Sequence, residues 1–373
     1  MQNAAPCKRK KSIFILSNSS GGLIHFRREV ISSLCAEYKV IISIPEDQDQ
    51  KALQEIGAQV VGSPMERKSK NPLKDLILLR QYDRLLKQYK PDLVLTYTIK
   101  PNIYGGWASQ RNRIPYIANI TGLGTSIENG GILSKISCGL YRIGLKKASC
   151  VFFQNEANLH KFTNWGIISG RTRLLPGSGV NLAAHPLADY PAQKEPVRFL
   201  FMGRIMKDKG IEELLYAVKR MHEKGYPVHL DIIGTYDENY RDAITEAQKC
   251  GVVQYHGYQS DVNVFIKNAH CVVLPSYHEG MSNVMLEAAA SGRPVITTNV
   301  PGCRETFDEG ITGLGCEAGD QDSLLKAMER FFSIPNAKKA EMGLRGHMKI
   351  AKEFNRDIII QAYLEEVHNL IQG

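Results

Sequence analysis

Short runs of apolar, mostly β-branched residues alternate with longer stretches of helical periodicity along almost the whole chain. In the first half these runs predict six strands, at residues 12–17, 40–44, 59–61, 93–98, 116–120 and 151–153. In the second half they predict five more, at residues 197–202, 229–233, 253–256, 271–274 and 294–297. Such alternation is typical of α/β proteins, in which helices cover both faces of a parallel sheet.

A segment without helical or strand periodicity, residues 181–196, separates the two series and contains three prolines. The chain has 373 residues, a usual length for two domains. We therefore expect two Rossmann-like, doubly wound parallel-sheet domains, residues 1–182 and 183–353, facing a central cleft. Residues 354–373 contain a last helix that we expect to pack back on the first domain.

The composition excludes several classes of protein. Hydrophobic residues make up 43% and charged residues 23% of the chain, as in soluble globular proteins, and no apolar stretch is long enough to span a membrane. The eight cysteines form no cluster with zinc spacing, which favours a reduced, cytoplasmic protein. P-loop, serine-hydrolase and zincin motifs are absent. Asp47-Gln48-Asp49 matches a DxD metal motif, but we interpret it as a solvated turn.

Positive charge is concentrated in the first half of the chain. Residues 1–190 hold 26 Lys and Arg against 13 Asp and Glu, a net charge of +13, whereas residues 191–373 have a net charge of −4. A basic surface of this kind suits nucleic acid, anionic lipid or a phosphorylated acceptor, and it can also serve solubility alone.

Residues 275–294 carry the most informative candidate chemistry. The preceding strand ends in a loop that contains Glu279, and Ser282 or Asn283 then caps a helix. The start of such a helix offers free N–H groups and readily binds phosphate. Glu279 and Glu287, beside that site, are expected to accept hydrogen bonds from sugar hydroxyls. The alternative is that both only complement the helix dipole or face solvent.

Two further loops follow predicted strands. Gly203 lets the backbone approach a ligand, and Arg204 and Lys209 precede the next helix. Two fixed cations could neutralise a diphosphate that leaves a nucleotide sugar; a solvated basic loop is the alternative. Gly22 and its glycine neighbour follow the first strand and permit a close backbone approach, although they lack the spacing of a dinucleotide fingerprint.

Together these segments resemble the retaining GT-B glycosyltransferases of family 4, which use nucleotide-diphosphate sugars. The resemblance covers most of the chain and is strongest over residues 197–320. The motifs that carry it are Gly203-Arg204…Lys209-Gly210, Glu279-x7-Glu287 and Val300-Pro-Gly-Cys-Arg-Glu305.

By motif position, the resemblance implies a role for each candidate residue. Arg204 and Lys209 would bind the donor diphosphate and Glu279 the donor sugar, and these three would carry catalysis. The nucleotide-sugar site would further include Gly203, Tyr258 against the base, Glu287 on the ribose, and the helix start formed by Gly280, Met281, Ser282 and Asn283. Gly22 would line the acceptor side. Thr121 stands where many members carry a histidine, so the resemblance does not extend to a histidine-assisted step.

The resemblance also implies the reaction. We expect metal-independent, retaining transfer of a hexose or N-acetylhexosamine from a UDP-sugar, with GDP as the alternative nucleotide and no cofactor. Residues 97–106 and 119–129 are similar to bacterial capsular polysaccharide and O-antigen glycosyltransferases. A polyprenyl-diphosphate-linked glycan acceptor, peripheral contact with the anionic inner face of the cell membrane, and no nucleic-acid partner are therefore expected. The alternatives are a nucleotide-sugar epimerase of the same architecture and a non-catalytic nucleotide- or glycan-binding module.

Overall fold

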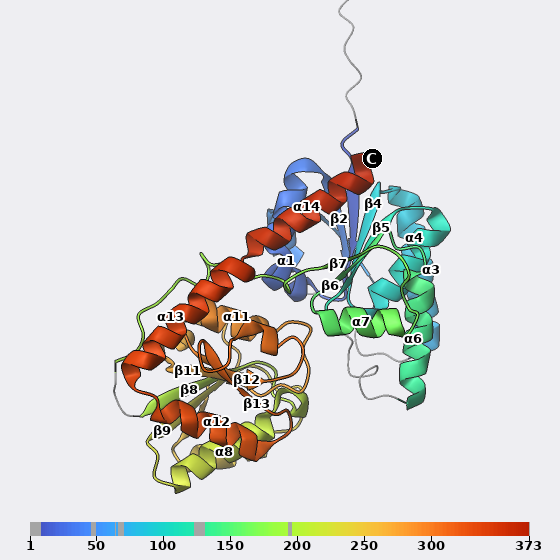
Figure 1. The fold of residues 1–373 in the computed structure, drawn as a ribbon. Helices are drawn as coiled ribbons and strands as arrows, with labels where there is room; N and C mark the ends of the chain where they lie inside the picture. Colours follow the sequence, from blue (N-terminus) through green and yellow to red (C-terminus); the bar gives the residue numbers. More distant parts are fainter. Residues whose placement is uncertain are drawn as a thin grey trace, which may run out of the picture. The chain divides into compact units, whose positions relative to one another are not determined.

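The structure is a computed structural model that describes residues 9–45, 50–63, 65, 71–122, 131–192 and 196–372. The chain divides into two compact units (Figure 1). Unit 1 consists of Met1–Leu175 and Asp357–Gly373, and unit 2 of Pro176–Arg356. The sequence predicts boundaries after residues 182 and 353, whereas the structural units change over after residues 175 and 356.

Unit 1 contains a seven-stranded parallel sheet with the strand order β3-β2-β1-β4-β5-β6-β7. Its strands are β1 (Ser12–Leu16), β2 (Lys39–Ile44), β3 (Gln59–Gly62), β4 (Leu93–Tyr97), β5 (Tyr116–Ile120), β6 (Cys150–Phe153) and β7 (Thr172–Leu174). All five residues of β1 are buried, as expected for a central strand covered on both faces. Ile13 and Ile15 enter one core, and Phe14 and Leu16 the other.

Helices cover both faces of this sheet. Packed on one face are α1 (Ser20–Glu37), α2 (Gln50–Glu55) and α14 (Arg356–Gln372). Packed on the other are α3 (Pro72–Tyr89), a π-helical turn η1 (Pro101–Gly105), α4 (Gly106–Asn112), α6 (Gly131–Leu145) and α7 (Glu156–Asn164). No helix among the described residues has both the length and the apolar composition needed to cross a membrane.

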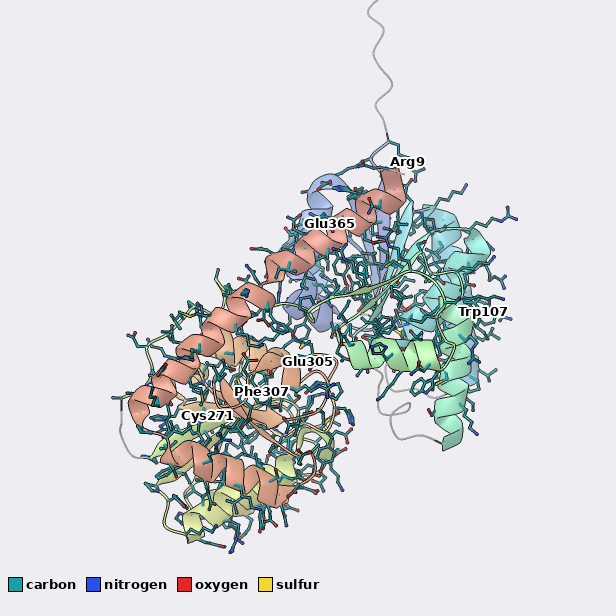
Figure 2. The ribbon with its side chains drawn as sticks, viewed as in Figure 1. Arg9, Trp107, Cys271, Glu305, Phe307 and Glu365 are labelled. Carbon is teal, nitrogen blue, oxygen red and sulfur yellow. The ribbon has the colours of Figure 1, made fainter. Side chains whose placement is uncertain are left out.

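The last helix, α14, is firmly attached to unit 1. Tyr363 is fully buried, its hydroxyl donates to the side-chain oxygen of Asn119, and its ring meets Phe152 edge-on at 5.0 Å. Glu365, labelled in Figure 2, accepts a hydrogen bond of 2.7 Å from Arg173 on β7. The C-terminal helix thus completes the core of the N-terminal unit.

Unit 2 contains a six-stranded parallel sheet with the order β10-β9-β8-β11-β12-β13. Its strands are β8 (Val197–Met202), β9 (Val228–Ile233), β10 (Val253–Tyr255), β11 (Cys271–Leu274), β12 (Val295–Thr298) and β13 (Gly313–Cys316). Its helices are α8 (Ile211–Glu223), α9 (Arg241–Lys249), α10 (Asn263–Asn268), α11 (Asn283–Ala290), α12 (Gln321–Ser333) and α13 (Asn336–Glu353). Two parallel-sheet α/β domains are therefore confirmed.

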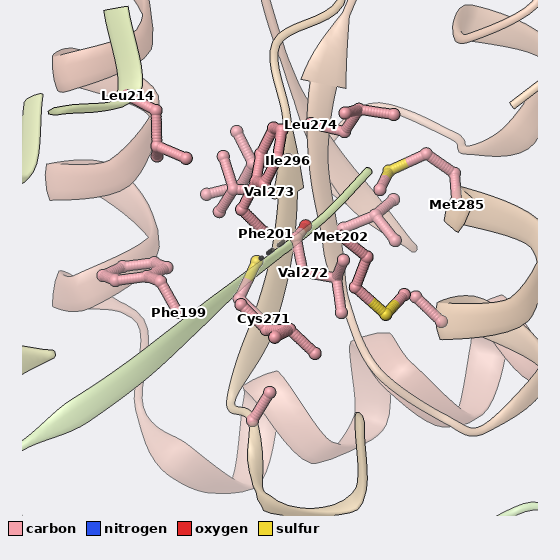
Figure 3. Close-up of a cluster of buried hydrophobic side chains, with 14 of the residues drawn as sticks. Phe199, Phe201, Met202, Leu214, Cys271, Val272, Val273, Leu274, Met285 and Ile296 are labelled. Atoms are coloured by element: carbon pink, nitrogen blue, oxygen red, sulfur yellow. Dashed lines mark hydrogen bonds between the residues drawn. The ribbon is translucent and has the colours of Figure 1, made fainter. Parts of the chain in front are cut away.

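The core of unit 2 is built from apolar strand residues that meet α8 and α11 (Figure 3). Phe199 and Cys271 are completely buried, and the Cys271 thiol donates weakly to the carbonyl of Val272 at 3.6 Å. Burial raises the pKa of Cys271 well above its usual value, so this cysteine is a packing residue rather than a nucleophile. All seven cysteines among the described residues are free thiols.

Candidate active site

Two loops meet where the strand order of unit 2 reverses. β8 lies beside β11, and the chain runs outward from this pair toward both edges of the sheet. Residues 203–210 and 275–282 follow these strands and leave the same edge of the sheet. The N–H of Tyr277 donates to the carbonyl of Asp208 at 2.9 Å, which joins the two loops. Open parallel sheets bind their ligands at such a reversal.

Glycines shape the strand ends at this edge. Gly210 has a φ of 71° and precedes α8 at a point where a Cβ atom would collide with the backbone of Pro275. Gly234, after β9, lies too close to the Gly203 carbonyl to accept a side chain. The N–H of Gly234 donates to the carbonyl of Gly257 at 2.8 Å. The ends of β8, β9 and β10 are thus held together by backbone contacts.

Lys209 and Glu279 form an ion pair between the two loops. Each side chain is only 16% exposed, so solvent screens the attraction weakly and the two groups hold each other in place. The structure therefore brings together two of the three residues that the sequence assigned to catalysis. A cation and a hydrogen-bond acceptor stand side by side where a phosphate and a sugar could both be reached.

Arg204, the third of these residues, lies at the end of β8 and pairs with Asp237 at 2.7 Å. The Arg204 side chain is 48% exposed, and exposed ion pairs contribute little to stability. Arg204 can therefore exchange its carboxylate partner for another anion at small cost. Asp237 was missed in the sequence, because it belongs to no motif and lies 33 residues further along the chain.

The loop after β12 supports Glu279. Gly302 has a φ of 86°, and a Cβ atom there would lie 2.5 Å from the Glu279 carbonyl oxygen. The carbonyl of Gly302 accepts from the N–H of Ser282 at 2.7 Å, and its own N–H donates to the carboxylate of Glu305, labelled in Figure 2, at 2.7 Å. The third motif of the resemblance therefore fixes the backbone that carries Glu279.

Ser282, one of the two N-cap residues that the sequence indicates, is the N-cap of α11, but its side chain makes no capping bond. Ser282 Oγ and Asn283 Oδ1 are buried without a hydrogen-bond partner within the described part of the chain. The N–H of Ser282 already donates to the carbonyl of Gly302, so Ser282 Oγ and Asn283 Oδ1 are the side-chain oxygens at this helix start that a ligand could meet. Gly280 and Met281 are buried in the same loop, and the Met281 side chain packs against Gly177.

Glu287 lies in the second turn of α11, among buried apolar residues. Burial raises the pKa of its carboxyl to about 7, and the positive charge of Arg356 opposes this rise only in part.

Tyr258 follows Gly257 at the end of β10 and is 64% exposed, which leaves its ring free to stack on a flat group.

Gly22 lies on unit 1, in the first turn of α1, whose N-cap is Ser19. It is exposed, and a Cβ atom there would have no atom of the described structure within 4 Å. Packing within unit 1 therefore does not require glycine at this position. Thr121 follows the end of β5 at the same edge of the sheet. Asp47, Gln48 and Asp49, and residues 123–129 of the segment 119–129, lie outside the described residues.

Unit 1 also has a strand-order reversal, between β1 and β4. Thr98, directly after β4, has a φ of 72°, a conformation that costs a β-branched residue energy. The Thr98 hydroxyl is buried and has no hydrogen-bond partner among the described residues. The sequence singles out residues 97–106 only by resemblance and gives no sign of this strain.

Glu213 on α8 is another residue that sequence reasoning missed. The Tyr277 hydroxyl donates to Glu213 Oε1 at 2.6 Å, and the nearby negative charge adds to burial in raising the pKa of Tyr277. This contact fixes the loop that carries Glu279.

Across the described ranges, no group of three or more His, Cys, Asp or Glu side chains is arranged to hold a metal ion.

Two protein families match the chain, one in each unit. The family described as "Glycosyl transferases group 1" matches residues 187–346, within unit 2, and the family described as "Glycosyl transferase 4-like" matches residues 13–155, within unit 1.

A curated relative from Campylobacter jejuni, N,N'-diacetylbacillosaminyl-diphospho-undecaprenol alpha-1,3-N-acetylgalactosaminyltransferase, is 26% identical, covering 97% of this chain and 99% of the relative. The capsular polysaccharide biosynthesis glycosyltransferase CapM of Staphylococcus aureus is 35% identical over 45% of each chain.

Solved structures share the fold of the whole chain. Anabaena Alr3699/HepE in complex with UDP and glucose has a TM-score of 0.79 at 17% identity, covering 96% of this chain and all of that one. Sucrose-phosphate synthase from Thermosynechococcus elongatus has a TM-score of 0.80 at 19% identity, covering 97% of this chain and all of that one.

Proposed function

The chain belongs to the GT-B glycosyltransferases of family 4, and on that premise we propose that it transfers a hexose or N-acetylhexosamine from a UDP-sugar with retention. The proposed acceptor is a polyprenyl-diphosphate-linked glycan at the inner face of the cell membrane, in the biosynthesis of a surface polysaccharide. The names of two relatives support this choice, since the Campylobacter relative acts on a diphospho-undecaprenol-linked sugar and CapM acts in capsular polysaccharide biosynthesis.

The observation that carries the proposal is the Lys209–Glu279 pair at the strand reversal of unit 2. A donor diphosphate placed at Lys209 and Arg204 would bring the sugar to Glu279, which accepts hydrogen bonds from its hydroxyls. Negative charge then develops on the leaving diphosphate beside the cations of Lys209 and Arg204, where electrostatic stabilisation of the transition state lowers the barrier.

The transfer itself needs no protein nucleophile in this proposal. The bond between the anomeric carbon and the diphosphate oxygen breaks, and an acceptor hydroxyl oxygen bonds to that carbon on the same face of the sugar. The proton of the acceptor hydroxyl passes to a leaving phosphate oxygen. Because side-chain cations meet the diphosphate, we propose that no metal ion is required.

A thermal-shift panel of UDP, GDP, ADP and their common sugars, with and without EDTA, tests the donor site. A ligand at about 100 times its Kd stabilises a protein by about 2.7 kcal/mol, so a donor should give a clear shift. Stabilisation by UDP compounds in the presence of EDTA is expected. The proposal of a metal-independent UDP site is wrong if UDP compounds stabilise the protein only in the absence of EDTA. It is also wrong if another nucleotide alone stabilises the protein.

Matched lysine variants test the catalytic assignment. Lys207 and Lys209 share one short 3-10 turn, but the Lys207 side chain is exposed. Lys209→Ala should lower kcat at least about a hundredfold without a matching loss of stability, whereas Lys207→Ala should keep near-normal activity. Equal losses of activity in both variants would contradict a specific role for Lys209.

NMR of the product tests the proposed retention, because it gives the anomeric configuration of the transferred sugar. An inverted product would contradict retention.

A further inference from the structure

Helix α3 of unit 1 already has an apolar stripe that accounts for its packing. Leu78, Leu79, Tyr82 and Leu86 are buried and enter the core on one face of the sheet. Their spacing of three and four residues is that of a helix with one face toward the core. A helix of this kind is expected to carry polar residues on its other face.

The outward face of α3 is apolar over its first two turns. Leu73 is 69% exposed, Leu76 42% and Ile77 53%. The same face continues with Arg80 and Arg84, which are exposed and make no hydrogen bond or ion pair within the described ranges. Leu73, Leu76 and Ile77 are not among the residues by which α3 packs on the core of unit 1, since Leu78, Leu79, Tyr82 and Leu86 make those contacts.

Helix α6 repeats this arrangement. It packs with α3 against α4 and η1, and it covers the same face of the sheet, so both helices present their outward faces to the same side of unit 1 (Figure 1). Ile136 and Ile143, seven residues apart, are 53% and 45% exposed. Residues 131–147 contain four basic residues and no acidic one. We name this surface the α3–α6 face and define it by Leu73, Leu76, Ile77, Ile136 and Ile143.

The helices on the opposite face of the same sheet differ. Among the described residues of α1 and α2 no large hydrophobic side chain is exposed, and α14 has one, Ile358. Both acidic residues of α3 are neutralised, Asp75 by Lys100 at 2.7 Å and Asp83 by Lys87 at 2.7 Å. Among the described residues, the α3–α6 face therefore carries more exposed large apolar side chains than the helices on the opposite face of the sheet, and the exposed Arg80 and Arg84 lie on the same face of α3.

We propose that the α3–α6 face docks on a lipid bilayer that contains anionic headgroups, with Leu73, Leu76 and Ile77 inserted among the acyl chains. Apolar side chains ringed by Lys and Arg are the composition of helices that lie in a membrane interface. The excess of positive charge in residues 1–190 acts in the same direction. The inference rests on the proposed function, because a polyprenyl-linked acceptor held in the membrane is the reason why this enzyme would bind a membrane.

Vesicle flotation of the full chain tests the proposal. Wild type should float with phosphatidylcholine vesicles that contain phosphatidylglycerol, and less with phosphatidylcholine alone, with salt weakening the binding. Leu73→Ser/Leu76→Ser/Ile77→Ser should lose at least about tenfold in vesicle affinity, or about 1.4 kcal/mol. Arg80→Gln/Arg84→Gln should lose about fivefold per arginine, and only on anionic vesicles.

Leu344→Ser/Met348→Ser on α13 of unit 2 is the matched control, because these side chains are 42% and 59% exposed. It should float like wild type. The docking face is wrong if wild type fails to float on anionic vesicles at low salt, or if the α3 triple variant floats as well as the control. It is also wrong if the apolar variant abolishes only self-association, because the face then binds a second copy.

Transfer to a water-soluble acceptor analogue separates the two proposals. The α3 triple variant should keep its transfer rate to such an analogue and lose transfer to an acceptor embedded in vesicles. Vesicle binding without transfer to any acceptor would overturn the proposed function alone. Transfer to the soluble analogue without vesicle binding would overturn the docking face alone.

Discussion

Replacing Glu287 by glutamine should change how the stability of unit 2 depends on pH. Burial raises the pKa of the Glu287 carboxyl from 4.5 to about 7. Between these values the folded protein holds a proton that the unfolded chain has released, so stability falls as the pH rises. The loss of stability is complete once the pH exceeds about 7. There the carboxyl is ionised in both states, and burial of its charge destabilises the folded state.

The size of the effect follows from the two pKa values. Each tenfold difference in proton affinity corresponds to about 1.4 kcal/mol, so a rise from 4.5 to about 7 gives at most about 3.5 kcal/mol. Glutamine carries no charge at any of these pH values. Glu287→Gln should therefore stabilise ligand-free unit 2 by up to about 3.5 kcal/mol near pH 8.5, and by almost nothing near pH 4.5.

Urea unfolding of the full chain at several pH values measures this difference, with the two units followed as separate transitions where they separate. Glu246→Gln is the control, because this side chain is 71% exposed and its replacement removes no buried charge. The reasoning is refuted if Glu287→Gln changes stability by the same amount at pH 5 and pH 8.5.

Ligand binding should also depend on the ionisation of the Glu287 carboxyl. If the ionised Glu287 accepts hydroxyl groups of the ribose, binding favours the carboxylate and releases a proton near pH 7. UDP affinity should then weaken as the pH falls through about 7. Calorimetry in buffers of different ionisation enthalpy measures the proton release, and UDP binding with no proton release near pH 7 would remove Glu287 from the ribose site.

Three further substitutions test other parts of the structure. Gly302→Ala places a Cβ 2.5 Å from the Glu279 carbonyl oxygen at a positive φ, so it should cost about 1–3 kcal/mol in urea unfolding and lower kcat more than tenfold; unchanged kinetics would contradict the support of Glu279 by this loop. Thr98→Asn, at a φ of 72°, should raise the stability of unit 1 by about 1 kcal/mol, and a lower Tm would argue against backbone strain. Tyr363→Ala empties a buried site on α14 and should cost unit 1 about 3–5 kcal/mol, whereas an unaltered Tm would mean that α14 is dispensable.

The strands that sequence reasoning found and missed differ in composition. Central strands such as β1 are continuous apolar runs, which a parallel sheet buried on both faces requires. β13 (Gly313–Cys316) was missed because half of its residues are glycine, which is rare in strands. In the structure the glycines are needed, since a Cβ at Gly313 would lie 2.6 Å from the Val295 carbonyl oxygen. A sequence shows the glycine but not the backbone that approaches it.

The candidate site was predictable as far as it depends on topology. Loops after β8 and β11 had to leave the same edge of the sheet, so the convergence of Lys209 and Glu279 follows from the order of the strands. The partners of these residues were not predictable in the same way. Asp237 and Glu213 lie 33 and 64 residues from the side chains they contact, and each belongs to an otherwise ordinary loop or helix.

The two cations of the site are held differently, and this difference indicates how they would share a diphosphate. Lys209 is only 16% exposed and is paired with Glu279, so its position is set before any ligand binds. Arg204 is 48% exposed and paired with Asp237, and a pair in that much solvent contributes little. A phosphate that reaches the site would therefore find Lys209 already placed, and would draw Arg204 from Asp237 at small cost. Glu279, released in part from its lysine, would then be free to accept hydrogen bonds from a sugar.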